Sequence, residues 1–300
     1  MVHQSHIYKH LEDKFQDVLS MPWKEKKKMS TPSTSVFKLI RVKEGKVVLS
    51  PKKQKLYHCG VGILLYLVKH TRPDFANTTC KFWKAMDVAN YLHYKELLRV
   101  ITFALQTQEK GIVLKPDLKT VRLNLKIYVD AEFAGDQDNQ RSIMGWLIYL
   151  NDTLVGWDSK AMSGVTLSST ETEYVSMSEG LKDLKFIYMS LKYLKMKVNL
   201  PTILLLNNIG EIEMLDLKTN KYRTKHVDTR YHWIRGFIED NLVNVKDVKS
   251  EDNTSYICTK NVPAKLYKKH LEKLMSNVGF FYRCNTQTIG KARTYQDTYE

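Results

Sequence analysis

The chain has 300 residues and a mass of 35.1 kDa, which allows one large domain or two ordinary ones, and its 43% hydrophobic content is enough for a buried core. Its 47 Lys and Arg exceed its 32 Asp and Glu, and the formal charge of +15 favours an acidic partner such as nucleic acid over a small acidic metabolite. The longest apolar run, Val61–Val68, is far shorter than the roughly 20 residues of a transmembrane helix, and the amino terminus lacks the apolar core of a secretory signal. We therefore expect an intracellular protein, nuclear or cytoplasmic, with no membrane contact. The four cysteines show no metal-ligand spacing, which predicts reduced structural thiols at Cys59, Cys80, Cys258 and Cys284.

Residues 1–56 are the most basic part of the chain. They hold 13 Lys and Arg against 5 Asp and Glu, so this segment carries a net charge of +8. Its basic clusters, Lys24–Lys28 and Lys52–Lys55, are separated by the polar stretch Ser30–Ser35. Charged, proline-containing stretches are typical of linkers and loosely held arms, so we predict a basic, partly flexible amino-terminal segment.

A small helical block is predicted for residues 57–119. Apolar residues recur at helical intervals in Val61–Val68 and in Tyr91–Gln106, and the stretch Thr71–Asp74 interrupts the pattern between them. Gly111 and Pro116 then mark a boundary, after which the period of the pattern changes.

Alternating residues after this boundary predict three antiparallel strands. In Val121–Asp130 the apolar residues share one face and the polar residues, Asp130 among them, share the other. Met144–Leu150 and Thr153–Trp157 follow, joined by the turn residues Asn151 and Asp152.

The next elements predict an α/β frame. A long amphipathic helix, Thr170–Lys195, begins with a capping box in which Ser168 and Glu171 bond to each other's backbone. The all-apolar run Ile203–Leu206 is typical of a buried parallel strand. The remaining pattern predicts helices near Ile209–Leu217 and Tyr231–Asn241, a strand at Leu242–Val245, a helix at Pro263–Met275, and a disordered tail over residues 276–300.

Three acidic residues lie at element ends that such a sheet would bring together. Asp130 ends the first strand, and helical periodicity puts Glu173, unlike Glu171, in line with the buried stripe of its helix. Asp228 precedes the helix of Tyr231–Asn241. Three hard oxygen ligands suit Mg²⁺, and two such ions about 4 Å apart are the usual apparatus for attack of water on a phosphodiester. Two structural alternatives stay open, because Glu173 would equally pair with a nearby Lys or Arg and Asp228 would equally cap its helix.

Four motifs carry a resemblance to a known family. Their order and spacing together resemble the ribonuclease H domain of Copia-type retrotransposon polyproteins, and upstream Tyr57–Leu67 with Thr71–Asp74 resembles the segment that follows the reverse transcriptase palm in the same polyproteins. The likeness covers roughly residues 7 to 275, and the four ribonuclease H motifs are Tyr128–Asp136, Arg141–Trp146, Leu167–Tyr174 and Arg223–Arg235.

The resemblance implies a ribonuclease H-like fold, a mixed five-stranded sheet with flanking helices, that cleaves the RNA strand of an RNA–DNA hybrid with two Mg²⁺ ions. It assigns catalytic and metal-binding roles to Asp130, Glu173 and Asp228. The fourth carboxylate belongs just after the buried strand, where this chain has Asn207, and an amide oxygen brings no charge to a cation. Glu132 also stands where the family has aspartate, and Ile209 and Gly210 replace a more polar pair.

The expected organisation is therefore a basic segment (1–56), a helical remnant of the reverse transcriptase (57–119), a ribonuclease H-like domain (120–275) and a tail (276–300). The polymerase turn of the family contains an Asp-Asp dipeptide, which this chain lacks, so we do not expect an active reverse transcriptase. The leading hypothesis is a ribonuclease H-type nuclease impaired by Asn207. The alternatives are a non-catalytic nucleic-acid-binding remnant, held to phosphates by its lysines, and a degenerate product with no selected role.

Overall fold

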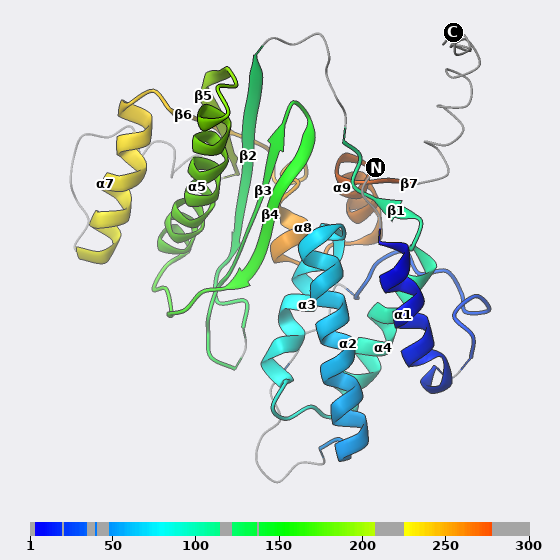
Figure 1. The fold of residues 1–300 in the computed structure, drawn as a ribbon. Coiled ribbons are helices and arrows are strands. Elements are labelled where there is room, and N and C mark those ends of the chain that lie inside the picture. Colours follow the sequence, from blue (N-terminus) through cyan, green and yellow to red (C-terminus); the bar gives the residue numbers. More distant parts are fainter. Residues whose placement is uncertain are drawn as a thin grey trace, which may run out of the picture.

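The structure is a computed structural model that describes residues 4–19, 21–34, 40, 48–114, 122–136, 138–207 and 225–277. A block of helices built from the first part of the chain lies against one side of a five-stranded sheet, and two further helices lie on the other side of the sheet (Figure 1).

In the described ranges, the helical block contains four α-helices and three short 3₁₀ helices. The α-helices are α1 (Ser5–Phe15), α2 (Pro51–His70), α3 (Ala76–Phe82) and α4 (Tyr91–Gln106), and the 3₁₀ helices are η1 (Gln16–Val18), η2 (Pro73–Phe75) and η3 (Trp83–Ala85). The two predicted helices are confirmed, and Asn90 and His93 cap the start of α4 reciprocally.

Two parts of the basic segment are more ordered than the sequence suggested. Helix α2 begins at Pro51, a residue suited to a first helical turn, so Lys52–Lys55 form helix and not a linker. Helix α1 was not predicted. It buries Tyr8, Leu11 and Phe15, which recur at helical intervals between charged residues and pack into the core of the helical block.

The sheet has the predicted mixed topology, with strand order β4-β3-β2-β5-β6. Strands β2, β3 and β4 form an antiparallel meander, and β5 and β6 run parallel to β2 on its other side. This confirms the predicted fold class of a mixed five-stranded sheet with flanking helices. The strands are β2 (Leu123–Glu132), β3 (Ile143–Leu150), β4 (Thr153–Ala161), β5 (Val198–Leu206) and β6 (Val243–Asp247).

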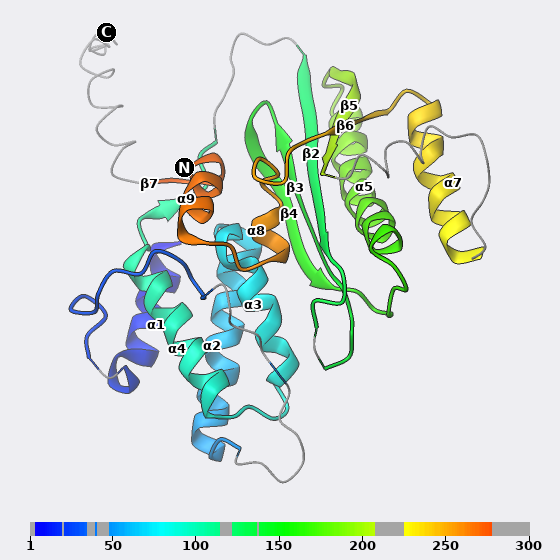
Figure 2. The same ribbon diagram turned by 180° about the vertical axis from the view of Figure 1, so that it is seen from behind.

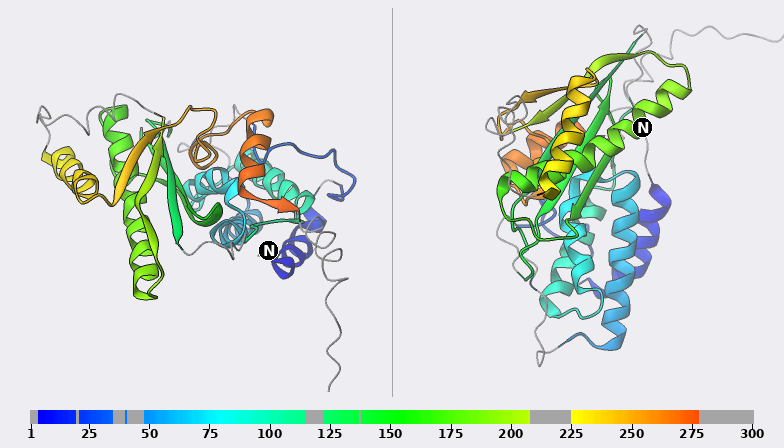
Figure 3. Two further views of the ribbon diagram at one scale, coloured as in Figure 1. Left: turned by 90° about the horizontal axis from the view of Figure 1, so that it is seen from above. Right: turned by 90° about the vertical axis from the view of Figure 1, so that its left-hand side faces the viewer.

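Helices cover both faces of the sheet (Figures 2 and 3). One face packs against α5 (Ser169–Tyr193), beside which lies α7 (Lys225–Glu239). The other face meets the helical block together with α8 (Tyr256–Thr259) and α9 (Ala264–Leu274). The face of β2 that alternation marks as polar is therefore covered as well, and Tyr128 of that face packs on the helical core. Alternation along one strand does not distinguish solvent from a second packed layer.

The long helix α5 is fixed at its start by two side chains. The hydroxyl of Ser168 accepts a hydrogen bond from the Glu171 backbone N–H at 3.1 Å, as the capping box predicts. The Glu171 carboxylate instead accepts from the backbone N–H of Leu167 at 2.7 Å. Further along, Met177 and Leu184 are buried against the sheet, so the stripe that contains Glu173 faces the sheet as predicted.

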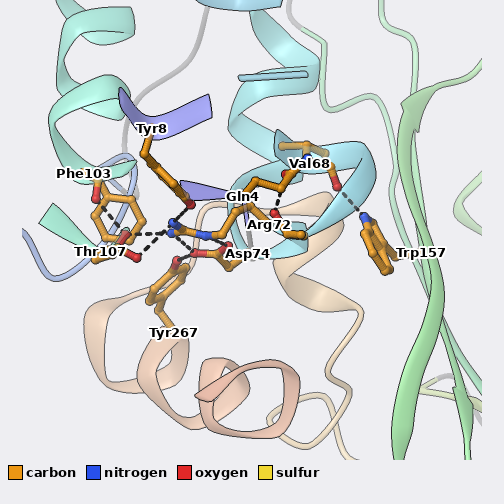
Figure 4. A network of polar contacts seen from close by, with 10 residues as sticks. Gln4, Tyr8, Val68, Arg72, Asp74, Phe103, Thr107, Trp157 and Tyr267 are labelled. Atoms are coloured by element: carbon orange, nitrogen blue, oxygen red, sulfur yellow. Dashed lines mark hydrogen bonds and ion pairs between the residues drawn. The ribbon is translucent and has the colours of Figure 1, made fainter. Parts of the chain in front are cut away.

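A buried polar network joins elements near the two ends of the described part of the chain inside the helical block (Figure 4). The guanidinium of Arg72 forms a two-pronged pair with Asp74, with both N–O distances 2.8 Å and both side chains fully buried. Arg72 also donates to Tyr8 of α1 and to Thr107, while Tyr267 of α9 donates to Asp74 at 2.9 Å. Helix α9, near the carboxyl end of the described chain, is thus anchored to amino-terminal helices.

Two short strands add to the same connection. Strand β1 (Lys110–Gly111) pairs with β7 (Ser276–Asn277), so the first residues assigned to the tail form an antiparallel ladder with the end of the helical block. The indole N–H of Trp157 on β4 also donates to the Val68 carbonyl of α2 at 2.7 Å.

Several sequence predictions lie outside the described residues. These are the helix of Ile209–Leu217, the first residue of the predicted strand at Val121, the tail from residue 278 onward, and Cys284. Among the helices that the structure describes, none is long and apolar enough to cross a membrane. The cysteines in the described ranges, Cys59, Cys80 and Cys258, are free thiols.

Candidate functional site at the carboxyl end of the sheet

Asp130 and Asn207 lie at the same end of two neighbouring parallel strands. Tyr128 of β2 pairs in register with Leu205 of β5, so the same register places Asp130 level with Asn207, the residue after β5. Adjacent strands are about 4.8 Å apart, which brings these two side-chain positions close together. The carboxyl ends of β2 and β5 therefore place Asp130 and Asn207 at one edge of the sheet, and the roles that the sequence assigns to these residues stay a prediction.

Asp130 is completely buried and already has partners. The ammonium of Lys260 lies 3.4 Å from one carboxylate oxygen and 3.5 Å from the other, and the hydroxyl of Thr259 donates to the same carboxylate. Burial raises the pKa of Asp130 above its ordinary value, and Lys260 and Thr259 oppose that rise only in part. Both partners belong to α8 or the residue that follows it, on the side of the sheet facing the helical block.

Glu173 approaches the site from the opposite side, on the first turns of α5. One turn further along, the hydroxyl of Ser176 donates to the backbone carbonyl of Asp130 at 2.9 Å, which fixes this part of α5 against the end of β2. Glu173 is half-buried and lies within electrostatic range of Lys260. The structure therefore brings Asp130 and Glu173 to one place, with the charge of Lys260 acting on both.

Lys260 is held in its charged form. Burial alone lowers its pKa, but Asp130, Tyr256 and Glu173 raise it by more, so the pKa lies above the ordinary lysine value. The ammonium also lies 3.9 Å from the centre of the Tyr256 ring, where the face of the aromatic ring attracts a cation.

Asn207 offers one oxygen to the site. Its amide nitrogen donates to Ser250 at 3.1 Å, which fixes the orientation of the side chain. Its amide oxygen is buried and has no hydrogen-bond partner among the described residues. A buried acceptor without a partner is costly, and its presence at this edge marks a position that favours a donor or a cation.

Asp228 differs from its predicted position. It is the fourth residue of α7, within the helix and not before its start, so it is not the predicted N-cap. Its side chain lies outside the part of the chain that the structure describes. The meeting of Asp228 with Asp130 stays a prediction.

Curated proteins similar to this chain include retrotransposon polyproteins. The chain is 30% identical over 214 residues to the retrovirus-related Pol polyprotein from transposon RE2 of Arabidopsis thaliana, a match that covers 71% of this chain and 14% of that protein. It is 28% identical over 223 residues to the Pol polyprotein from transposon TNT 1-94 of Nicotiana tabacum, covering 74% of this chain and 16% of that protein. No protein-family model matches the chain.

The chain is homologous to Copia-type Pol polyproteins over about 70% of its length. It spans only a small part of the Pol polyproteins that it matches, as the shares of 14% and 16% state. A solved structure of the foamy viral protease-reverse transcriptase in complex with RNA/DNA hybrid is 13% identical, covers 72% of this chain and 27% of that chain, and has a TM-score of 0.42. The part of the chain that the structure describes comprises a mixed five-stranded sheet with flanking helices and a helical block on the amino-terminal side.

Ribonuclease H-like domains typically use Mg²⁺, so the Copia-related site can be tested for its fit to a divalent cation. Among the described residues, no group of three His, Cys, Asp or Glu side chains is close enough to hold a metal ion. Asp130 faces an ammonium, Asn207 is neutral, and Glu173 is the second carboxylate at this edge. A bound cation needs net negative charge from its ligands, and Lys260 removes much of it. The described residues in this arrangement do not fit a pair of Mg²⁺ ions.

Thr259 and Lys260 are the site residues that sequence reasoning missed in this Copia-related chain. Both contact a carboxylate about 130 positions earlier in the chain, through a helix of four residues. No hydrophobic period marks so short a helix, and a lone lysine in a basic protein carries no local signal. The open alternative for Glu173 predicted a nearby Lys or Arg, but it did not identify Lys260.

Proposed function

We propose that the chain is a nucleic-acid-binding ribonuclease H-like domain in which hydrolysis of the RNA strand of an RNA–DNA hybrid is strongly reduced. The observation that carries the proposal is the pairing of buried Asp130 with Lys260, next to the uncharged Asn207. Homology to the Copia-type Pol polyproteins supports the substrate class, and the charge of +15 supports a polyanionic partner.

The reduction follows from the charge at the site. When bound, Mg²⁺ in such a domain supplies an activated water and neutralises the charge that develops on the phosphodiester. In this chain the ammonium of Lys260 already neutralises Asp130, and exchange of an aspartate for Asn207 removes a further negative charge. Lys260 is only partly exposed, with 28% of its side chain accessible, so displacing it would separate a largely desolvated ion pair.

A second function, binding without any cleavage, is favoured by Asn207 and Lys260 as well. Lysines that contact phosphates hold a hybrid without chemistry, because phosphate contacts need charge and hydrogen-bond donors only. The two functions differ in one outcome, which is whether removing the obstacles at Asn207 and Lys260 produces cleavage.

The test is a cleavage assay of the full chain on an end-labelled RNA–DNA hybrid with Mg²⁺ or Mn²⁺. It compares the natural protein with Asn207→Asp, Lys260→Met and the double variant. Lys265→Met, at an exposed position of α9, is the matched loss of one lysine that forms no ion pair with Asp130. Asp130→Asn in the most active protein checks that any cleavage comes from this site.

We expect weak or undetectable cleavage by the natural protein and by Lys265→Met, and a clear gain in Asn207→Asp that the double variant increases. No cleavage by any of the variants would contradict a reduced nuclease and leave the binding function. Equal cleavage by the natural protein and Asn207→Asp would contradict the proposed effect of the missing charge. In both cases hybrid affinity should fall as salt rises, because each phosphate contact releases counterions.

A further inference from the structure

A second basic site lies in the helical block, away from the end of the sheet. Between the N-terminal turns of α2, one side of α4 and the loop that follows α1 there is a hollow of about 730 Å³. Small-molecule sites usually occupy roughly 300–1,000 Å³, so the hollow is large enough for a nucleotide. Its charged lining residues are Lys26, Lys52, Lys53, Lys95, Glu96 and Arg99.

The charge of the hollow is strongly positive. Glu96, the acidic residue of the lining, already accepts a hydrogen bond from Ser33 at 2.6 Å and lies 3.9 Å from Arg99. Within the described ranges, no ion pair engages Lys26, Lys52, Lys53 or Lys95. Burial lowers the pKa of Lys26, the sign of an ammonium that has lost part of its water and would gain from an anion.

The start of α2 contributes a further positive potential. Helix α2 is 20 residues long, and its cap residue Ser50 makes no side-chain bond to the first backbone N–H groups. Lys52 and Lys53 stand in this first turn, so free N–H groups, the helix dipole and two ammonium groups coincide.

Two tyrosines give the hollow an aromatic part. Tyr94 is 4% exposed, lines the hollow, and has a buried hydroxyl with no hydrogen-bond partner among the described residues. Tyr91, at the first position of α4, is 64% exposed beside the hollow, and the Lys53 ammonium lies 5.9 Å from its ring centre.

We propose that this hollow binds a phosphorylated nucleotide unit, with its phosphate on Lys52, Lys53 and the start of α2 and its base stacked on Tyr91. Cationic side chains with an exposed aromatic ring are the combination that binds single-stranded nucleic acid. The nucleotide belongs either to a single strand or to a free nucleoside phosphate, and both present the same phosphate and base. In Figure 1 the first turns of α2 and α4 lie at the end of the molecule toward which β2 runs, so a strand reaching the sheet site would have the hollow at the same end.

The experiment measures binding of a labelled 12-nucleotide DNA strand to the full chain by fluorescence anisotropy. It compares the natural protein with Lys52→Gln/Lys53→Gln and with Tyr91→Ala, all at exposed positions. The control is Lys265→Gln/Lys268→Gln on α9, which removes the same charge from exposed positions outside the hollow. Thermal unfolding checks that all variants fold.

The lysine pair should lower affinity at least tenfold and reduce the slope of log affinity against log salt by about 1.4, whereas the control pair changes neither in this way. Tyr91→Ala should lower affinity about 5- to 150-fold, the usual effect of losing one stacking contact. Competition with thymidine monophosphate identifies the source. Displacement of the strand at low millimolar nucleotide indicates a free-nucleotide site, and failure to displace it indicates a strand. If the variants of the hollow and the control variant bind the DNA strand and thymidine monophosphate as the natural protein does, the proposal is wrong. This conclusion holds whatever the cleavage assay shows.

Discussion

The buried pair of Arg72 and Asp74 makes a sharp prediction about stability. In Arg72→Met the Asp74 carboxylate loses both of its 2.8 Å guanidinium contacts and keeps the Tyr267 hydroxyl at 2.9 Å, while Tyr8 and Thr107 lose a donor. Removing one partner of a buried ion pair costs about 3–5 kcal/mol, because the remaining charge stays buried without compensation. That is a large part of the roughly 5–15 kcal/mol by which domains are stable. We expect Arg72→Met to lower the free energy of unfolding by about 3–5 kcal/mol.

Urea unfolding followed by circular dichroism measures this loss as a shift of the midpoint at constant slope. Lys69→Met is the control, because Lys69 is 59% exposed and pairs with Asp158 at 3.0 Å on the surface, where such a pair contributes at most about 1 kcal/mol. In Arg72→Met/Asp74→Asn both charges are absent, so the double variant should be more stable than Arg72→Met alone. A loss below about 1 kcal/mol in Arg72→Met, or a double variant less stable than the single one, would refute this reasoning.

Three further substitutions test the packing near the carboxyl end of the described chain and in α2. His270 is fully buried, and burial, aided by Lys273, lowers its pKa to about 4. As pH falls, the unfolded chain therefore takes up a proton on this histidine before the folded chain does. The free energy of unfolding should fall by up to about 3 kcal/mol between about pH 6.5 and about pH 4. His270→Phe should abolish this loss, which urea titrations at pH 7 and pH 4.5 would measure. A Cβ atom at Gly145 would lie 2.5 Å from the Cβ of Cys258. Gly145→Ala should therefore lower the free energy of unfolding by about 1–3 kcal/mol and make the Cys258 thiol react faster with a thiol reagent. An unchanged rate of thiol reaction would mean that α8 does not pack on β3. Gly62 of α2 has open space around such an atom, so Gly62→Ala should raise the melting temperature by stabilising the helix by up to about 1 kcal/mol.

The sheet and the long helices could be predicted from the sequence because their hydrophobic periods are strong. Strands β2 and β3 and helices α4 and α5 appear within two residues of their predicted limits, whereas β4 extends to Ala161 and β5 begins at Val198, four and five residues beyond the predicted limits. Helix α1 was missed because lysines and histidines surround its buried residues, and charge then outweighs the weak helical period. Helix α8 was missed because four residues carry no period at all.

The candidate site could be predicted in part, for a different physical reason. Strand ends and helix starts indicate where Asp130 and Glu173 lie, because sheet geometry places such ends together. Which charge faces Asp130 depends on a loop and a short helix that return from far along the chain to Lys260. Contacts of this kind cannot be predicted from a local sequence pattern, because they produce no periodicity in the neighbouring residues.

The short ladder between β1 and β7 changes how the chain should be divided. Because Lys110–Gly111 pairs with Ser276–Asn277, and Tyr267 reaches Asp74, the segment that completes the sheet side of the molecule is also the last piece of the helical block. One hydrophobic cluster accordingly contains Leu64 of α2 and Leu147 of β3. A cut near residue 120, the boundary expected from sequence, would divide one folding unit. The helical block and the sheet should therefore unfold cooperatively, and damage to the helical block should melt the sheet as well.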